Sequence, residues 1–107
     1  MGGKDRTGEM KPAIVKPTVA HDRERRQFEA SVDGERCTLD YELDGAVMII
    51  THVLVPDRVG GRGIAAALTA AALDTARDEG WRVVPQCPYA AAFVARHTEY
   101  ADLIAAR

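Results

Sequence analysis

The stretch that most constrains this chain runs from Val55 to Gly80 and reads VPDRVGGRGIAAALTAAALDTARDEG. A β-branched strand leads into Pro56, and a loop with three glycines (Gly60, Gly61, Gly63) precedes an alanine-rich segment typical of a helix. Glycine lets successive backbone N–H groups point to one side without a Cβ clash, and the first turn of a helix has unpaired N–H donors at the positive end of its dipole. This order of elements predicts a site for phosphate or pyrophosphate.

The loop matches neither of two common phosphate-binding motifs. It lacks the GK[ST] ending of a P-loop, and its glycine spacing differs from that of a dinucleotide-binding turn. Arg58 and Arg62 flank the glycines, where they either meet phosphates or remain solvated. The residues alone also leave open a glycine-rich strand-to-helix connection that binds no ligand.

The length and charge of the chain limit its class. A chain of 107 residues is expected to form one domain. Residues 1–27 hold seven Lys/Arg against four Asp/Glu, so +3, whereas residues 28–107 hold seven against twelve, so −5. An acidic folded part argues against a nucleic-acid partner, although it suits a cationic acceptor. We expect residues 1–25 to be a flexible tail and residues 26–107 to be the domain.

Targeting and metal signals are absent from the sequence. No basic start precedes an apolar stretch, and no apolar run reaches the roughly 18 residues that a membrane span needs. We therefore expect no membrane partner and a cytoplasmic chain whose two cysteines are thiols. Its three histidines and two cysteines lack the spacing of metal ligands, so no metal site is expected. We expect Cys37 to be a core residue.

Alternating apolar residues predict three antiparallel strands over residues 28–32, 36–43 and 47–55, joined by Asp-Gly hairpin turns. The third strand is apolar on both faces and should be central in the sheet. Strict alternation puts Val47, Ile49, Val53 and Val55 on one face of this strand. It puts His52 on the other face, with Met48, Ile50 and Leu54.

The second half of the chain predicts a crossover unit. A helix over residues 63–79, ended by Gly80, leads to a fourth strand over residues 82–84 that should run parallel to the third. Helical spacing should turn one side of this helix toward the sheet: Ile64, Ala65, Leu68, Ala72 and Thr75 or Ala76. Pro88 favours the start of a second helix with Cys87 at its N-cap, and a short last helix follows over residues 99–105. The fold class is α+β: a mixed sheet of an antiparallel meander plus one parallel strand, with a crossover helix and C-terminal helices.

Two motifs resemble a known family. Arg58-x-x-Gly61-x-Gly63 resembles the [QR]-x-x-G-x-[GA] signature of the GNAT superfamily of N-acetyltransferases. The block CPYAAAFVARHTEYADL resembles the C-[PS]-[YF]…HPEY ending of the small single-domain GNAT-like (YjdJ-type) family. The similarity spans about Phe28 to Ile104, and it implies a GNAT-like topology. Two departures stand out: Thr98 replaces a proline, and Leu54 stands where relatives tend to carry a glutamate.

The resemblance implies acetyl-CoA as cofactor. In this family the loop amides bind the pyrophosphate of acetyl-CoA, and the strand before the loop pairs with the pantetheine. The residues expected to bind CoA are Val53, Leu54, Val55, Arg58, Val59, Gly60, Gly61, Arg62, Gly63 and Ile64.

Cys87 and His52 are the candidate catalytic residues. A thiol at a helix N-terminus has its thiolate favoured, so Cys87 could accept the acetyl group or protonate departing CoA, although a free cysteine is also commonly a small core residue. His52 could serve as general base on the attacking amine, or it could be a hydrogen-bonded core histidine.

Together these features predict an acetyl-CoA-dependent N-acetyltransferase that acts on an amine of a small molecule or a protein. Two alternatives remain at this level. One is a non-catalytic acyl-CoA-binding or sensing module, and the other is an interaction domain with a vestigial loop.

Overall fold

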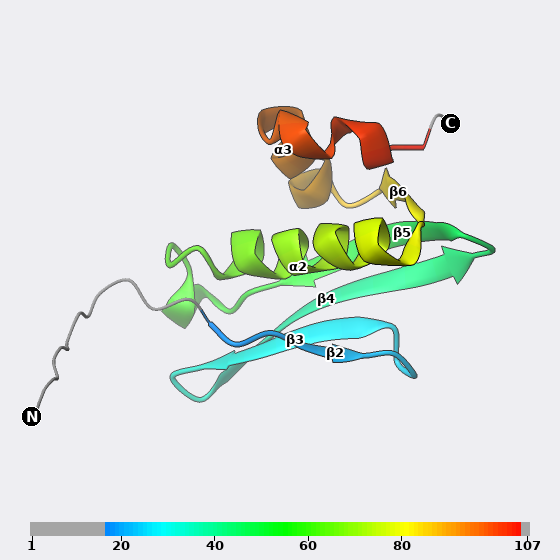
Figure 1. Cartoon of the computed structure of the whole chain (residues 1–107). Coiled ribbons are helices and arrows are strands. Elements are labelled where there is room, and N and C mark those ends of the chain that lie inside the picture. Colours follow the sequence, from blue (N-terminus) through cyan, green and yellow to red (C-terminus); the bar gives the residue numbers. More distant parts are fainter. Residues whose placement is uncertain (1–16, 106–107) are drawn as a thin grey trace, which may run out of the picture.

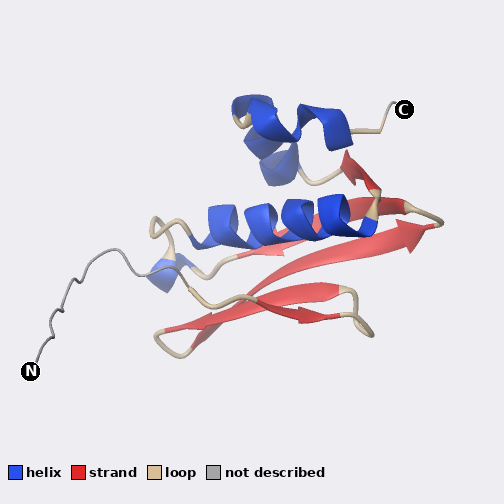
Figure 2. Ribbon diagram, in the orientation of Figure 1, coloured by secondary structure: helices blue, strands red, loops and turns tan. Residues whose placement is uncertain are grey.

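The computed structural model describes residues 17–105, which form one five-stranded sheet covered on one face by a long helix (Figures 1 and 2). The strands lie in the order β2-β3-β4-β5-β6. The first three pairings are antiparallel, and the last, β5 with β6, is parallel. The predicted α+β class, with its meander and single parallel strand, is confirmed.

The elements follow the sequence patterns closely. The strands are β2 (Ala20–Asp22), β3 (Gln27–Val32), β4 (Glu35–Asp44), β5 (Val47–Leu54) and β6 (Arg82–Pro85). The helices are α2 (Ile64–Glu79) and α3 (Pro88–Arg96), with two 3₁₀ segments, η1 (Asp57–Val59) and η2 (Thr98–Leu103).

The core lies between α2 and the sheet. Alternate residues of the strands point toward the helix, and Phe28, Leu39 and Met48 are almost wholly buried there. Leu68 and Ala72 of α2 meet them from the other side, at the helical spacing that the sequence predicted. Removing this much apolar surface from water is the main force that holds the two layers together.

The turns explain where the strands end. Asp33 and Gly34 both have positive φ, 50° and 79°, as a tight two-residue hairpin between β3 and β4 requires. Gly80 ends α2 at φ 79°, a left-handed conformation that glycine adopts without strain.

The strand pair β4–β5 contains a bulge at Thr51. Asp40 lies opposite His52 but Tyr41 lies opposite Ile50, so Thr51 has no partner in β4. Its side-chain hydroxyl instead donates to the Asp40 carbonyl at 3.2 Å. One extra residue reverses the faces that all later residues of the strand occupy.

The bulge corrects the predicted faces of β5. Val53 lies opposite the buried Leu39 and so points toward α2. His52 lies opposite Asp40, on the other face of the sheet, and is exposed. The expectation that His52 shares a face with Met48 and Ile50 is therefore wrong, because strict alternation takes no account of an inserted residue.

Two further details differ from the sequence expectations. Residues 20–22 fall in the segment expected to be a flexible tail, yet they pair with β3 as strand β2. The last predicted helix is a 3₁₀ segment that ends at Leu103 rather than at residue 105. The rest of the expected tail, residues 1–16, lies outside the described residues.

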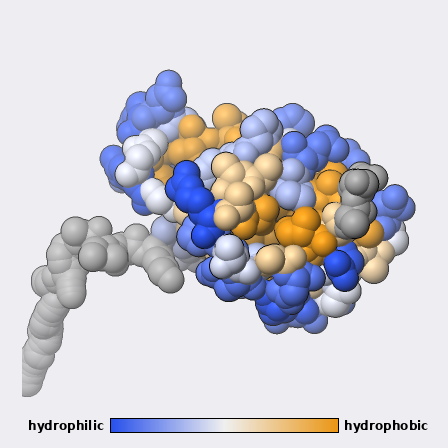
Figure 3. All heavy atoms as spheres, turned by 90° about the horizontal axis from the view of Figure 1, so that it is seen from above, coloured by the Kyte–Doolittle hydropathy of each residue, from blue (hydrophilic) through white to orange (hydrophobic). Residues whose placement is uncertain are grey.

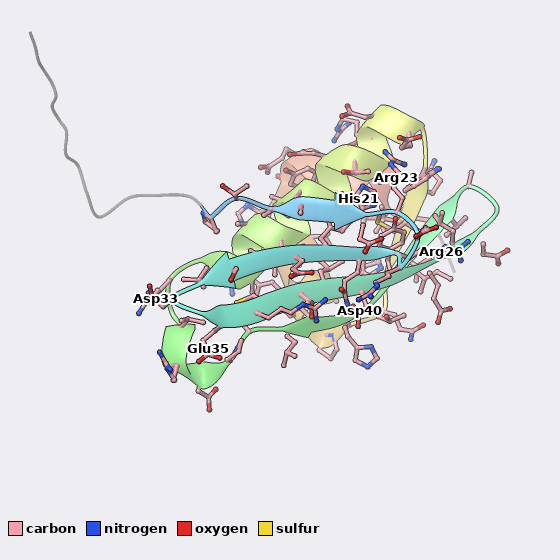
Figure 4. All side chains as sticks on the ribbon, turned by 90° about the horizontal axis from the view of Figure 1, so that it is seen from below. His21, Arg23, Arg26, Asp33, Glu35 and Asp40 are labelled. Carbon is pink, nitrogen blue, oxygen red and sulfur yellow. The ribbon has the colours of Figure 1, made fainter. Side chains whose placement is uncertain are left out.

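No helix covers the sheet face opposite α2 within residues 17–105 (Figure 4). This face carries polar side chains from β3 and β4, including Asp40, whose carboxylate accepts a hydrogen bond from Gln27 at 2.8 Å. Among the described helices, none is long and apolar enough to cross a membrane.

Candidate functional site

The glycine loop forms one wall of a small pocket. This pocket has a volume of about 260 Å³, and we call it the loop pocket. It is lined by Val55, Gly60, Gly61, Gly63, Ile64, Ala65, Ala66 and Tyr89. Five of these eight residues are among those expected to bind CoA, so the structure brings the predicted donor residues to one surface.

The N-terminus of α2 opens onto the loop. Gly63 is its N-cap, with φ 78°, and has no side chain to accept a bond from the first turn. The first intrahelical bond runs from the Ala67 N–H to the Gly63 carbonyl at 3.0 Å, so the N–H groups before Ala67 have no acceptor one turn earlier in the helix. These donors, with the positive end of the helix dipole, suit a phosphate group.

Among residues 17–105, no strand pairs with the β6 side of β5 beyond Ile50, and this free edge continues from the loop pocket. Strand β6 pairs with β5 only as far as Pro85, which lies opposite Ile50 and has no N–H to donate. Since backbone groups alternate between the two edges of a strand, the bulge at Thr51 turns the N–H and C=O of Val53 toward the side that β6 has left. This edge offers hydrogen bonds to an extended ligand.

Cys87 lies where the β5–β6 ladder ends. Its N–H donates to the Ile50 carbonyl at 2.9 Å, and it is the N-cap of α3, with Pro88 following, as predicted. The residue is 8% exposed. The thiol therefore borders the start of the free β5 edge and faces the core more than solvent.

Cys37, by contrast, is a core residue as expected. It is fully buried, and burial raises the pKa of its thiol.

His52 lies on the uncovered face of the sheet. It is exposed and stands across from Asp40, so it is not the hydrogen-bonded core histidine that the sequence left open. The structure thus separates the two catalytic candidates: Cys87 adjoins the free edge of β5, and the His52 side chain projects from one face of that same strand.

The other predicted residues divide by exposure. Leu54 is 59% exposed on the same face as His52, whereas Val59 is 1% exposed and packs in the core. Neither Arg58 nor Arg62 lines the loop pocket, and they form ion pairs with Glu35 and Asp33, respectively.

A larger and more open groove of about 630 Å³ adjoins the loop, and we call it the α2 groove. It runs along the alanines of α2 and is bordered by Arg62, Phe93, His97 and Tyr100. The imidazole of His97 stacks on the Phe93 ring with centroids 4.0 Å apart. Figure 3, seen from the side of α3 and η2, shows hydrophobic residues exposed among hydrophilic ones.

Sequence reasoning missed two members of the site. Asp33 and Glu35 contact the loop arginines from a hairpin more than 20 positions away in the chain, and no local pattern signals such a contact. Among residues 17–105, no group of three His, Cys, Asp or Glu could hold a metal ion.

The glycine loop, the open strand edge and the crossover helix all belong to one mixed α+β fold. Residues 27–103 match the family described as GCN5-related N-acetyl-transferase. The chain therefore belongs to this family, as the resemblance implied.

The chain is also similar to named proteins and to a solved structure. Protein NATD1 of Bos taurus is 43% identical over 79 residues, which cover 71% of this chain and 70% of that protein. Protein NATD1 of Homo sapiens is 40% identical, with coverage of 71% and 70%. A GCN5-like candidate N-acetyltransferase from Staphylococcus aureus, solved in solution by NMR, has the same fold, with a TM-score of 0.68 over 86% of this chain and 91% of that one, at 20% identity.

Proposed function

We propose that this protein is an acetyl-CoA-dependent N-acetyltransferase that moves an acetyl group to an amine. One observation carries the proposal: the loop pocket, the N-terminus of α2 and the free edge of β5 adjoin one another. A ligand that carries a pyrophosphate at one end of an extended, amide-containing arm needs N–H donors in this order: those of the loop and helix N-terminus for the pyrophosphate, then those of a strand edge for the arm.

The residues fit CoA in three parts. The amides of Gly61, Gly63 and the first turn of α2 bind the pyrophosphate. The backbone of Val53 and Val55 pairs with the pantetheine amides as an added strand would. The α2 groove, with the stacked His97 and Phe93 at its border, takes the nucleotide. Bound acetyl-CoA supplies a thioester, an acyl group already activated for transfer.

Cys87 and His52 then act near the thioester. In one route the Cys87 sulfur attacks the acetyl carbon, the bond from that carbon to the CoA sulfur breaks, and the thiol proton passes to the departing CoA thiolate. The amine then attacks the acetylated cysteine, and the bond from the acetyl carbon to the Cys87 sulfur breaks as the amide forms. In the direct route the amine attacks the thioester, and Cys87 gives its proton to the departing thiolate. In either route His52 takes the proton that the attacking amine loses.

The test is the release of CoA thiol in the presence of acetyl-CoA and a panel of small amines, peptide N-termini and protein lysines. We expect release with at least one class of amine, and we expect it to fall in Cys87→Ala and in His52→Gln while CoA binding persists. Cys37→Ala is the matched control, because it removes a thiol that the core encloses. Release that is equal in all four proteins would contradict the catalytic assignments.

A second candidate is a non-catalytic acyl-CoA-binding module. The low exposure of Cys87, 8%, favours it, because a nucleophile must be reached by the acyl group. The two functions differ in one result: the binding module shows tight CoA binding in the wild type but no turnover with any amine.

A further inference from the structure

Two ion pairs connect the glycine loop to the β3–β4 hairpin. Arg58 Nη1 lies 3.1 Å from Glu35 Oε2, and Arg62 pairs with Asp33. Asp33 and Glu35 sit at the tip of one hairpin, beside η1 and the loop (Figure 4). One turn of the chain therefore engages both arginines that flank the three glycines.

The direction of these side chains matters for anion binding. Among residues 17–105, no arginine lines the loop pocket, although Arg58 lies two positions before its first glycine and Arg62 lies between Gly61 and Gly63. Guanidinium groups are well suited to phosphate, and here both groups are bound to carboxylates instead. A phosphate in the pocket would compete with each carboxylate for its arginine and would be repelled by both carboxylates.

We propose that Asp33 and Glu35 lower and thereby set the affinity of the loop for its anionic ligand. Each carboxylate does so by holding its arginine, Arg62 or Arg58, away from the loop pocket until a phosphate group takes the place of the carboxylate. This inference rests on the proposed function, since it names carboxylates that control the proposed CoA site. Neither carboxylate touches the reacting atoms, so both act through the arginines.

The expected size of the effect on CoA affinity, and its dependence on salt, follow from how exposed the paired side chains are. The Arg62 and Asp33 side chains are 49% and 58% exposed, and Arg58 is 71% exposed against 26% for Glu35. Exposed pairs are weak and screened by salt. Neutralising each carboxylate should tighten CoA binding by about 1.5- to 5-fold at low ionic strength, and the gain should shrink in about 1 M salt.

The experiment is calorimetric titration of CoA into the wild type, Asp33→Asn and Glu35→Gln. Asparagine tolerates the left-handed conformation that residue 33 adopts, so the turn should persist. Asp44→Asn is the matched control: it removes the same charge from the other Asp-Gly hairpin, at the opposite end of β4. A thermal melt of each variant verifies folding.

A double-mutant cycle separates this mechanism from a general change of charge. Glu35→Gln should tighten binding in the wild-type background and have a clearly smaller effect in Arg58→Gln, where Glu35 no longer holds a guanidinium that its loss could release. Equal tightening in both backgrounds, tightening by Asp44→Asn as large as by Glu35→Gln, or weaker binding in Asp33→Asn and Glu35→Gln would each overturn the inference while leaving CoA binding intact. Absence of CoA binding in every protein would overturn the proposed function as well.

Discussion

Substituting glutamate for Gly61 should weaken CoA binding at least about tenfold without unfolding the protein. Gly61 has φ 80° and lines the loop pocket, and a Cβ built there meets no atom within 4 Å. The space for a side chain is thus the space that the ligand would use. Gly45 offers a matched control, because its φ is 59°, nothing lies within 4 Å of its Cβ position, and it sits in the β4–β5 turn.

The expected free-energy changes distinguish a loss of stability from a loss of CoA affinity. A left-handed non-glycine residue costs about 1 to 2 kcal/mol, so Gly61→Glu and Gly45→Glu should lose similar stability. A carboxylate about 4 Å from a phosphate charge adds roughly 1 kcal/mol of repulsion in water and roughly 4 kcal/mol at an effective dielectric constant of about 20. For a pyrophosphate within the loop we expect the dissociation constant for CoA to rise at least about tenfold in Gly61→Glu alone.

The assay is a thermal melt with and without CoA. At a CoA concentration of about 100 times Kd, the ligand stabilises the native state by about 2.7 kcal/mol, which raises the Tm of a domain this size by roughly 10 to 20 °C. Gly45→Glu should keep this shift from its lowered starting Tm, and Gly61→Glu should show half of it or less. Equal shifts in the two variants would refute the assignment of the pyrophosphate to the loop.

Three other variants test separate parts of the account. His52→Gln should lower kcat by about 10²- to 10⁴-fold while the Kd for CoA stays within about twofold, as kinetics and calorimetry would show; an unchanged kcat would remove His52 from the mechanism. Leu68→Ala should cost about 2 to 5 kcal/mol in urea unfolding because Leu68 is fully buried between α2 and the sheet, and a cost below 1 kcal/mol would contradict the core described above. Burial lowers the pKa of His21, whose Nε2 lies 2.7 Å from the Tyr41 hydroxyl, so its contribution to stability is fully present above about pH 6.5 and is lost as pH falls below it. In His21→Gln the free energy of unfolding should therefore depend less on pH below about 6.5. A loss of stability on acidification that is larger in His21→Gln than in the wild type would contradict this prediction.

Local patterns in the sequence predicted most of the fold. The alternation of apolar residues predicted β3 and β4, and the Asp-Gly pairs predicted both hairpin turns. The helical spacing of Ile64, Leu68 and Ala72 predicted the buried side of α2. These features depend on neighbours within a few residues, which a sequence displays directly.

The bulge at Thr51 could not be predicted from local sequence patterns. Nothing in the run Val47–Val55 marks an inserted residue, because both faces of the strand are apolar and either register buries similar side chains. The position of His52 depended on it, and so did the direction of the Val53 backbone. Tertiary pairing with β4 decides the register, and a single strand does not carry that information.

Long-range contacts of the site were equally hidden. The sequence identified Arg58 and Arg62 but left open whether they meet phosphates or solvent, and the structure shows a third arrangement, pairing with a distant hairpin. Strand β2 was also missed, since three residues between turn-forming and charged neighbours show no alternation long enough to read.

The central claim is that the loop of residues 58–64 binds the pyrophosphate of CoA. Its most direct measurement is the Kd for CoA against that for pantetheine, which lacks the pyrophosphate and nucleotide, by calorimetry on the wild-type chain. The account predicts that CoA binds at least about 100-fold more tightly than pantetheine, because the amides of the loop and of α2 contact only CoA. Equal affinities, or no binding of CoA, would contradict it.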